Sequence, residues 1–353
     1  MPIAQARSVL TASEVKRQAA TCGFDLCGIA PVGELPELAF FPQWLEAGYA
    51  GRMDYLERSA ERRSDVRQIM PEAGTVVVFG TIYNTDQPYS IDSADRTEAA
   101  LARYAWGDDY HVAIGARLDQ MMAWLREQAG DALRARAYVD TGPVQERVYA
   151  RHAGLGWIGK NTCVIHPDLG SWIFLSEIIC NLELEPDVPA LDQCGTCTRC
   201  LDACPTGALA APYVLDARRC LSYLTIELKD AIPVEHRGDI GRHAYGCDIC
   251  QEVCPYNFTA ATTSDAAFAV REGLERPSLL ELWRRSDDDL RRILKGSPMK
   301  RAGVRRLRRN LAVALGNSGD PAAAAALNDR HASTCDDPLV EEHVRWALEK
   351  LGD

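Results

Sequence analysis

The stretch CGTCTRCLDACPTGAL, residues 194–209, places four cysteines in the pattern C-x2-C-x2-C-x3-C-P. This is the spacing of a bacterial ferredoxin, whose thiolates hold iron–sulfur clusters. A second, less regular set ends in a C-x2-C-x3-C-P pattern and comprises Cys220, Cys247, Cys250 and Cys254. The two sets predict a ferredoxin-like electron-transfer module inside a much larger chain of 353 residues.

The two cysteine sets are expected to interleave. In two-cluster ferredoxins, the last cysteine before the proline ligates the other cluster. That rule assigns one [4Fe-4S] cluster to Cys194, Cys197, Cys200 and Cys254, and the second to Cys204, Cys220, Cys247 and Cys250. A pair of structural zinc sites is the alternative, because zinc centres also use C-x2-C pairs. Four cysteines within eleven residues and the two proline-terminated motifs favour iron.

The composition is that of a globular protein, with 47% hydrophobic and 25% charged residues. No apolar run approaches the roughly 20 residues that a membrane-spanning helix needs, and residues 1–18 do not have the pattern of a signal peptide. We therefore expect a cytoplasmic protein without a membrane partner. The net charge of −11 argues against indiscriminate binding of nucleic acid, but a local basic patch is compatible with it.

The chain divides into three parts, and the predicted fold class is α+β. An α/β domain is expected over residues 1–185, with helices at 11–23 and 109–129 and strands at 24–30, 75–83, 135–140 and 171–180. The ferredoxin-like module covers 186–260. Helical patterns dominate 261–353, where ALGNSGD (314–320) and ALEKLGD (347–353) recur 33 residues apart. That recurrence predicts HEAT-like helical repeats.

A polar cluster follows the strand at 135–140, and Asp140 stands where this strand meets the turn TGP. A carboxylate at such a position is a candidate acid catalyst. The alternative interpretation is an aspartate that only caps the turn.

A basic segment, MKRAGVRRLRR at 299–309, contains six positive charges in an acidic chain. At helical spacing Arg301, Arg305, Arg308 and Arg309 are expected to share one face. Such a face suits the phosphates of a folded RNA. A solvated helix balanced by the acidic run at 286–289 is the alternative.

Several longer motifs resemble epoxyqueuosine reductase, and they occur in order along most of the chain. They are RYAWGDDYH (103–111), YVDTGPVQER (138–147), GLGWIGKNT (154–162), HPDLGSWIFLSEI (166–178), CTRCLDACPTGAL (197–209), CLSYLTIE (220–227) and GCDICQEVCPYN (246–257). The resemblance implies a cobalamin-dependent enzyme, related to reductive dehalogenases, that performs the last step of queuosine synthesis on tRNA. The part at 1–185 is then the cobalamin-binding domain.

The resemblance also implies roles for individual residues. Asp140 matches the family's proposed proton donor, and we expect burial beside the corrinoid to raise its pKa. Contacts to cobalamin are expected from Arg63, Tyr104, His111, Asn161, Val164, Ser171, Ser222 and Asp248. Contacts to tRNA are expected from Lys300, Arg301, Arg305, Arg308 and Arg309. An external donor such as a ferredoxin or flavodoxin is expected to supply electrons to a monomeric enzyme.

Two other functions are compatible with the cysteine motifs. A corrinoid reductive dehalogenase uses the same electron path on a different substrate, although the basic segment argues against it. A non-catalytic electron-transfer protein is the second rival, and it would carry iron and sulfide without a corrinoid.

Overall fold

The computed structural model describes residues 10–329 and 336–352. Its first part is built on a four-stranded sheet whose neighbouring strands are all antiparallel. The strands, in spatial order, are β1 (Leu26–Pro31), β2 (Thr75–Ile82), β7 (Ile173–Cys180) and β4 (Ala135–Tyr138). The prediction of an α/β domain is therefore wrong for this part, whereas the α+β class of the whole chain holds. The continuous apolar run of β2 resembles a parallel strand because both of its faces are buried.

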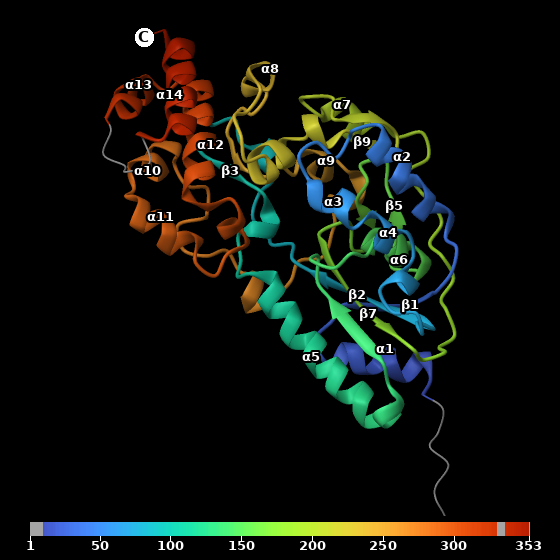
Figure 1. Ribbon diagram of the computed structural model, residues 1–353. Helices are drawn as coiled ribbons and strands as arrows, with labels where there is room; N and C mark the ends of the chain where they lie inside the picture. Colours follow the sequence, from blue (N-terminus) through green and yellow to red (C-terminus); the bar gives the residue numbers. More distant parts are fainter. Residues whose placement is uncertain (1–9, 330–335, 353) are drawn as a thin grey trace, which may run out of the picture.

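Helices cover both faces of this sheet (Figure 1). Val77 and Phe79 of β2 pack toward α1 (Ala12–Thr21) and α5 (Tyr110–Ala129), whereas Val76 and Val78 pack toward α6 (Glu146–His152). The connection from β1 to β2 contains three short helices, α2 (Phe40–Glu46), α3 (Asp54–Arg58) and α4 (Ala60–Ser64). The sheet thus forms the middle layer of the first part.

The starts of two helices follow from capping residues in the sequence. Thr11 caps α1 in a capping box with Glu14. Asp109 caps α5 through a hydrogen bond from the backbone N–H of His111. The cap of α5 places Asp109 and His111 at the same end of the helix, where β4 also ends.

The cysteine-rich module consists of short elements. They are α7 (Arg199–Ala203), β8 (Leu209–Ala211), β9 (Val214–Leu215), a π-helical turn at Tyr223–Glu227, α8 (Val234–Arg237), β10 (His243–Tyr245) and α9 (Ile249–Glu252). Strand β10 pairs in parallel with β3 (Ala100–Leu101) of the first part. A hairpin of β5 (Trp157–Ile158) and β6 (Val164–Ile165) also packs near the cysteines. The module is therefore joined to the first part by strand pairing.

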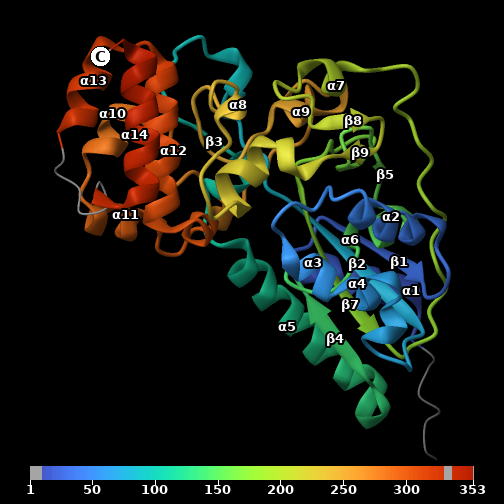
Figure 2. The same ribbon diagram turned by 45° about the horizontal axis from the view of Figure 1, so that its top comes forward.

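The regular elements of the C-terminal part are helices in the described residues, and Figures 1 and 2 show them packed to one side of the molecule. Its α-helices are α10 (Leu279–Arg284), α11 (Asp287–Leu294), α12 (Gly303–Ser318), α13 (Pro321–Asn328) and α14 (Pro338–Leu351). Helices α12 and α14 pack closely, and a Cβ on Gly316 would lie 2.8 Å from Ala347. Residues 99–105 of the first part enter this helical core.

The two recurring segments end α12 and α14, each before a left-handed glycine, Gly319 or Gly352. Their assignment as HEAT-like repeats stays a prediction. Among the described residues, no helix combines the length and apolar character required to cross a membrane.

Candidate active site

The structure brings together the cysteines of the first predicted set. Cys194, Cys197 and Cys200 lie around the start of α7, and Cys254 follows α9. All four line a cavity of about 290 Å³. Burial, together with the negative charges of Cys194 and Cys254, raises the pKa of Cys200 to about 11. Thiols that raise one another's pKa in this way favour a cation between them.

The second predicted set converges on a neighbouring point. Burial raises the pKa of Cys220, and the charge of Cys204 adds to the effect. Burial also raises the pKa of Cys247, next to Cys220. The charges of Cys247 and Cys220 also raise the pKa of Cys250, although the largest effect comes from a contact with Cys163 that the sequence pattern did not reveal. The members of this set therefore lie within range of one another's charges, and their assignment to one cluster stays a prediction.

The spacing of these thiols bears on the choice between iron and zinc. In the described part of the chain, no three His, Cys, Asp or Glu side chains are close enough to hold a single metal ion. A four-cysteine zinc site requires its sulfurs at about 2.3 Å from one ion. The choice of iron over zinc therefore rests on the cysteine motifs themselves.

The β5–β6 hairpin supports the first cysteine set. The indole Nε1 of Trp157 and the backbone N–H of Lys160 each lie 3.4 Å from Sγ of Cys194. The ammonium of Lys160 donates to the carbonyls of Gly195 and Cys197, at 2.6 and 2.9 Å. Hydrogen bonds to cluster sulfurs raise the reduction potential of an iron–sulfur centre. The motif at 154–160 is therefore a support for the cysteine loop.

Asp140 lies just beyond β4, in a left-handed backbone conformation with φ of 56°. Its side chain is 53% exposed, and Oδ2 lies 3.6 Å from Nε2 of His111. Burial acts to raise the pKa of Asp140, but the interactions with His111 and Tyr110 outweigh it, so the pKa lies below its ordinary value. The expectation of a raised pKa is therefore wrong. That expectation took account of burial but not of the basic partner His111.

His111 is held from both sides. Its Nδ1 lies 2.7 Å from Oδ1 of Asp109, and the other carboxylate oxygen of Asp109 pairs with Nζ of Lys300 at 2.6 Å. The contact with Asp140 raises the pKa of His111; burial opposes this effect, and Asp109 adds to it. The structure thus places His111 and Lys300, expected to contact cobalamin and tRNA, in one chain of charges that leads to Asp140.

Two acidic residues to which the sequence analysis assigned no role lie behind Asp140. Oε1 of Glu146 accepts a 2.7 Å hydrogen bond from the backbone N–H of Asp140. Burial, with the charge of Asp140, raises the pKa of Glu146 to about 8. Glu177 of β7 is fully buried, and its burial and the nearby Glu146 raise its pKa well above the ordinary value. A glutamate inside an apolar strand was the available signal, because such burial is rare without a partner.

The residues expected to bind cobalamin fall into two groups. Arg63, Tyr104 and His111 are half-buried around Asp140, and Arg63 donates to the carbonyls of Gly142 and Val144. The other five lie at the cysteine module. Asn161 donates to the carbonyl of Cys250, and Ser222 donates to the carbonyl of Cys247. Asp248 accepts from the N–H of Arg103, the Ser171 hydroxyl accepts from the side-chain amide of Asn257, and Val164 is in β6. Asn161, Val164, Ser171 and Asp248 are buried.

The structure corrects the predicted basic face. Arg308 and Arg309 are completely buried, so they present no charge to RNA. Arg308 pairs with Asp287 at 3.1 Å, and Arg309 donates to the carbonyls of Leu224, Leu228 and Asp230. Lys300, Arg301 and Arg305 remain exposed, although each has an acidic partner. The prediction failed because α12 begins only at Gly303, and the face of this helix that carries Arg308 and Arg309 is buried in the protein.

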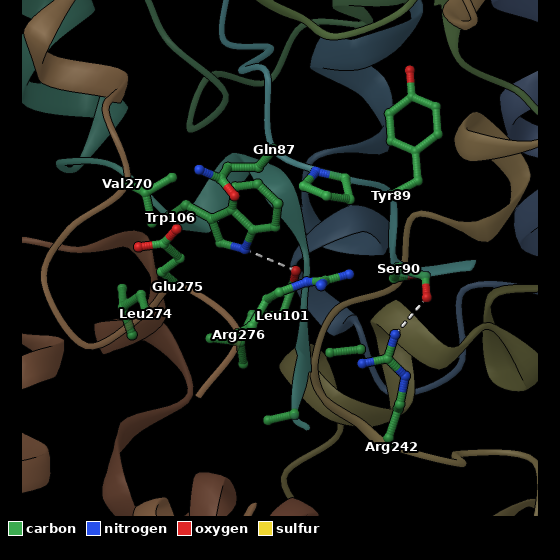
Figure 3. Close-up of a pocket in the computed structure, with 13 residues that line it drawn as sticks. Gln87, Tyr89, Ser90, Leu101, Trp106, Arg242, Val270, Leu274, Glu275 and Arg276 are labelled. Carbon is green, nitrogen blue, oxygen red and sulfur yellow. Dashed lines mark hydrogen bonds between the residues drawn. The ribbon is translucent and has the colours of Figure 1, made fainter. Parts of the chain in front are cut away.

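A separate pocket, shown in Figure 3, lies between residues 87–90, β3 and residues 270–276. Trp106 closes it by donating to the carbonyl of Leu101 at 3.0 Å, and Arg242 donates to the carbonyl of Ser90. Its volume is about 30 Å³, well below the roughly 300 Å³ of small-molecule sites. This pocket is therefore not a candidate active site.

Comparisons with known proteins show the family to which this chain belongs. A family model described as a 4Fe-4S double cluster binding domain matches residues 193–257, and one described as epoxyqueuosine reductase QueG, DUF1730, matches residues 63–141. The epoxyqueuosine reductases of Xanthomonas campestris pv. campestris and Pseudomonas aeruginosa are 41% and 42% identical to this chain. Both alignments cover 97% of this chain, with 96% and 95% of the relatives. A solved epoxyqueuosine reductase with an epoxyqueuosine-modified tRNA-Tyr stem loop superposes with a TM-score of 0.84 at 31% identity, covering 97% of this chain and 90% of that one. The chain belongs to the epoxyqueuosine reductase family.

Proposed function

We propose that this chain reduces epoxyqueuosine to queuosine in tRNA and releases the epoxide oxygen as water. Two [4Fe-4S] clusters held by the cysteine sets and a bound cobalamin would supply the electrons, which would come from an external donor. Family membership over nearly the whole chain supports this activity. One structural observation carries it further. The N–H of Arg103 donates to Asp248, beside Cys247, at 2.6 Å, while the next residue, Tyr104, lies within range of the charge of Asp140. One segment therefore connects the second cysteine set to the proposed acid.

The residues around Asp140 fit a corrinoid, whose rim of amide groups requires hydrogen-bond partners. Arg63 uses three of its N–H groups on Ser59, Gly142 and Val144, and among the described residues no partner occupies the other two. The hydroxyls of Tyr104 and Ser222 each donate one hydrogen bond and keep acceptor capacity. We propose that Arg63, Tyr104, His111 and Ser222 hold the cobalamin. Contacts from Asn161, Val164, Ser171 and Asp248 remain predictions.

The bound cobalamin would supply the electrons that open the epoxide. The chain itself supplies the proton and the geometry. Asp140 provides the proton for the departing oxygen, because its carboxyl is half exposed and its loop is tied to α6.

The tRNA is proposed to bind across the surface that carries Lys300, Arg301 and Arg305. The charge of Arg301 reaches Asp140, so a phosphate bound there lies near the acid. Splayed bases of the anticodon loop suit this site better than a duplex, because single-stranded loops expose their base edges.

We assign the three parts to separate tasks: 1–185 to cobalamin and catalysis, 186–260 to the two clusters, and the HEAT-like part at 261–353 to tRNA. The enzyme is proposed to act as a monomer in the cytoplasm.

The activity is tested with protein that holds both clusters, supplied with cobalamin and reduced. After incubation with tRNA that carries epoxyqueuosine, nucleoside mass spectrometry is expected to detect queuosine, which has one oxygen less. Absence of this product overturns the proposal. The same protein is offered a brominated phenol, and release of bromide without tRNA reduction would favour a dehalogenase. A pure electron carrier would give neither product.

A further inference from the structure

Three ionisable side chains from two segments form a line at the proposed acid. Asp109, the cap of α5, contacts Nδ1 of His111 at 2.7 Å. The opposite ring nitrogen, Nε2, faces Oδ2 of Asp140 at 3.6 Å. A buried carboxylate that orients a histidine toward a reacting group is a recurring arrangement in acid–base catalysis. Here Asp109 is almost fully buried, and Asp140 is half exposed.

The charges around this line decide where a proton resides. His111 faces two carboxylates, which outweigh its burial and the positive end of the α5 dipole. His111, Tyr110 and Arg301 interact with Asp140 and lower its pKa. The other ionisable groups within range of its charge are Glu146, Glu177, Tyr55, Tyr104 and Arg63. Lys300 neutralises part of the charge of Asp109. The pKa of His111 is raised and that of Asp140 is lowered, so both shifts favour the ion pair.

We infer that His111 carries the proton that Asp140 delivers, so that the acid of the reaction is a His111–Asp140 pair oriented by Asp109. This inference rests on the proposed reduction of epoxyqueuosine. His111 is a positioning and proton-storing residue in this account, because it acts on the substrate through Asp140.

The stoichiometry of the reaction gives such a store a use. An epoxide that becomes an alkene and water takes up two electrons and two protons. The electrons come from the reduced clusters. The first proton moves from the pair to the oxygen as one C–O bond opens, which leaves a hydroxyl group. The pair then regains a proton from solvent at the exposed side of Asp140, and the second proton leaves with that hydroxyl as water.

The test is the pH dependence of a single turnover by enzyme with matched iron and cobalamin content. In the unsubstituted protein, the rate is expected to fall only above the ordinary histidine pKa of about 6.5. In H111Q, Asp140 must hold the proton alone, so this fall is expected at least about 1 pH unit lower. At pH 7.5 the rate then drops about tenfold or more.

Two further variants keep the inference falsifiable if H111Q does not fold. D109N retains both members of the pair but loses one carboxylate beside His111. The single-turnover rate of D109N is therefore expected to fall at a lower pH than that of the unsubstituted protein. H236Q is the matched control, because His236 faces Asp239 at 3.8 Å on α8, outside the site. Its profile is expected to match the unsubstituted protein.

The outcomes separate this inference from the proposed function. If the unsubstituted protein gives no queuosine, the proposed function fails. If the unsubstituted protein gives queuosine, and the rates of H111Q and D109N fall at the same pH as its rate does, the proton does not reside on His111 and the inference is overturned.

Discussion

The backbone N–H of Asp140 donates a 2.7 Å hydrogen bond to Oε1 of Glu146. This bond fixes Asp140 in a left-handed conformation that non-glycine residues rarely adopt and that costs about 1–3 kcal/mol. Glu146 stands in the first turn of α6, and α6 packs on the sheet. The position of the proposed acid is thus set by a helix and not by its loop alone.

Substitution E146A is expected to release this loop and to reduce turnover by about 100-fold, because small displacements of a catalytic group have effects of that size. Its affinity for tRNA should stay within about twofold. E146Q is the matched control, since its amide oxygen still accepts the hydrogen bond. Single-turnover rates and tRNA binding measure both effects, and equal loss of turnover in E146A and E146Q would contradict this role.

The half-buried Glu146 and the fully buried Glu177 predict a pH-dependent stability. Because their pKa values are raised in the folded state, their contribution is fully present below the ordinary glutamate value and is lost as the pH rises. For Glu146 the window runs from about 4.5 to about 8. E177Q is expected to reduce the fall in Tm between pH 6 and pH 9, measured by thermal unfolding. E61Q, at an exposed position, should leave that fall unchanged.

The interleaved clusters predict the iron content of double variants. C204S/C220S removes two ligands from one set, so about half of the iron should remain. If each cluster instead used one contiguous motif, this variant would damage both clusters and lose nearly all iron. C194S/C254S is the reciprocal test at the first set. Iron analysis and electron paramagnetic resonance distinguish the two patterns.

Substitution of Arg308 is expected to lower stability, whereas substitution of Arg305 is expected to weaken tRNA binding. R308A breaks a buried pair with Asp287, which costs about 3–5 kcal/mol of unfolding free energy. R305A removes an exposed pair with Asp337 and should cost below about 1 kcal/mol. Only R305A should weaken tRNA binding and reduce its salt dependence by about one released counterion. Chemical unfolding and binding titrations at several salt concentrations measure these effects, and an R308A protein of unchanged stability would contradict the assignment.

Local patterns predicted much of this structure. The cysteine spacing anticipated the cavity that Cys194, Cys197, Cys200 and Cys254 line, whereas the two ligand sets stay predictions. The cap at Thr11 and the apolar run of β2 likewise follow from neighbours in sequence. These features depend on few residues and little on the remainder of the fold.

The errors arise from distant partners. Arg309 is buried by carbonyls of residues 224–230, which no helical spacing around 309 reveals. The pKa of Asp140 depends on His111, which a different segment supplies. The strand order that makes the sheet antiparallel places β7 between β2 and β4, and the apolar runs alone do not specify that order.

The most direct test of the account compares unsubstituted protein with D140N, both reduced and matched in iron and cobalamin, in one turnover of tRNA that carries epoxyqueuosine. We predict queuosine from the unsubstituted protein and a rate at least about 100-fold lower from D140N, the usual contribution of a general acid. Equal formation of queuosine by both proteins would contradict the assignment of Asp140 as the acid, and its absence from both would contradict the proposed reaction itself.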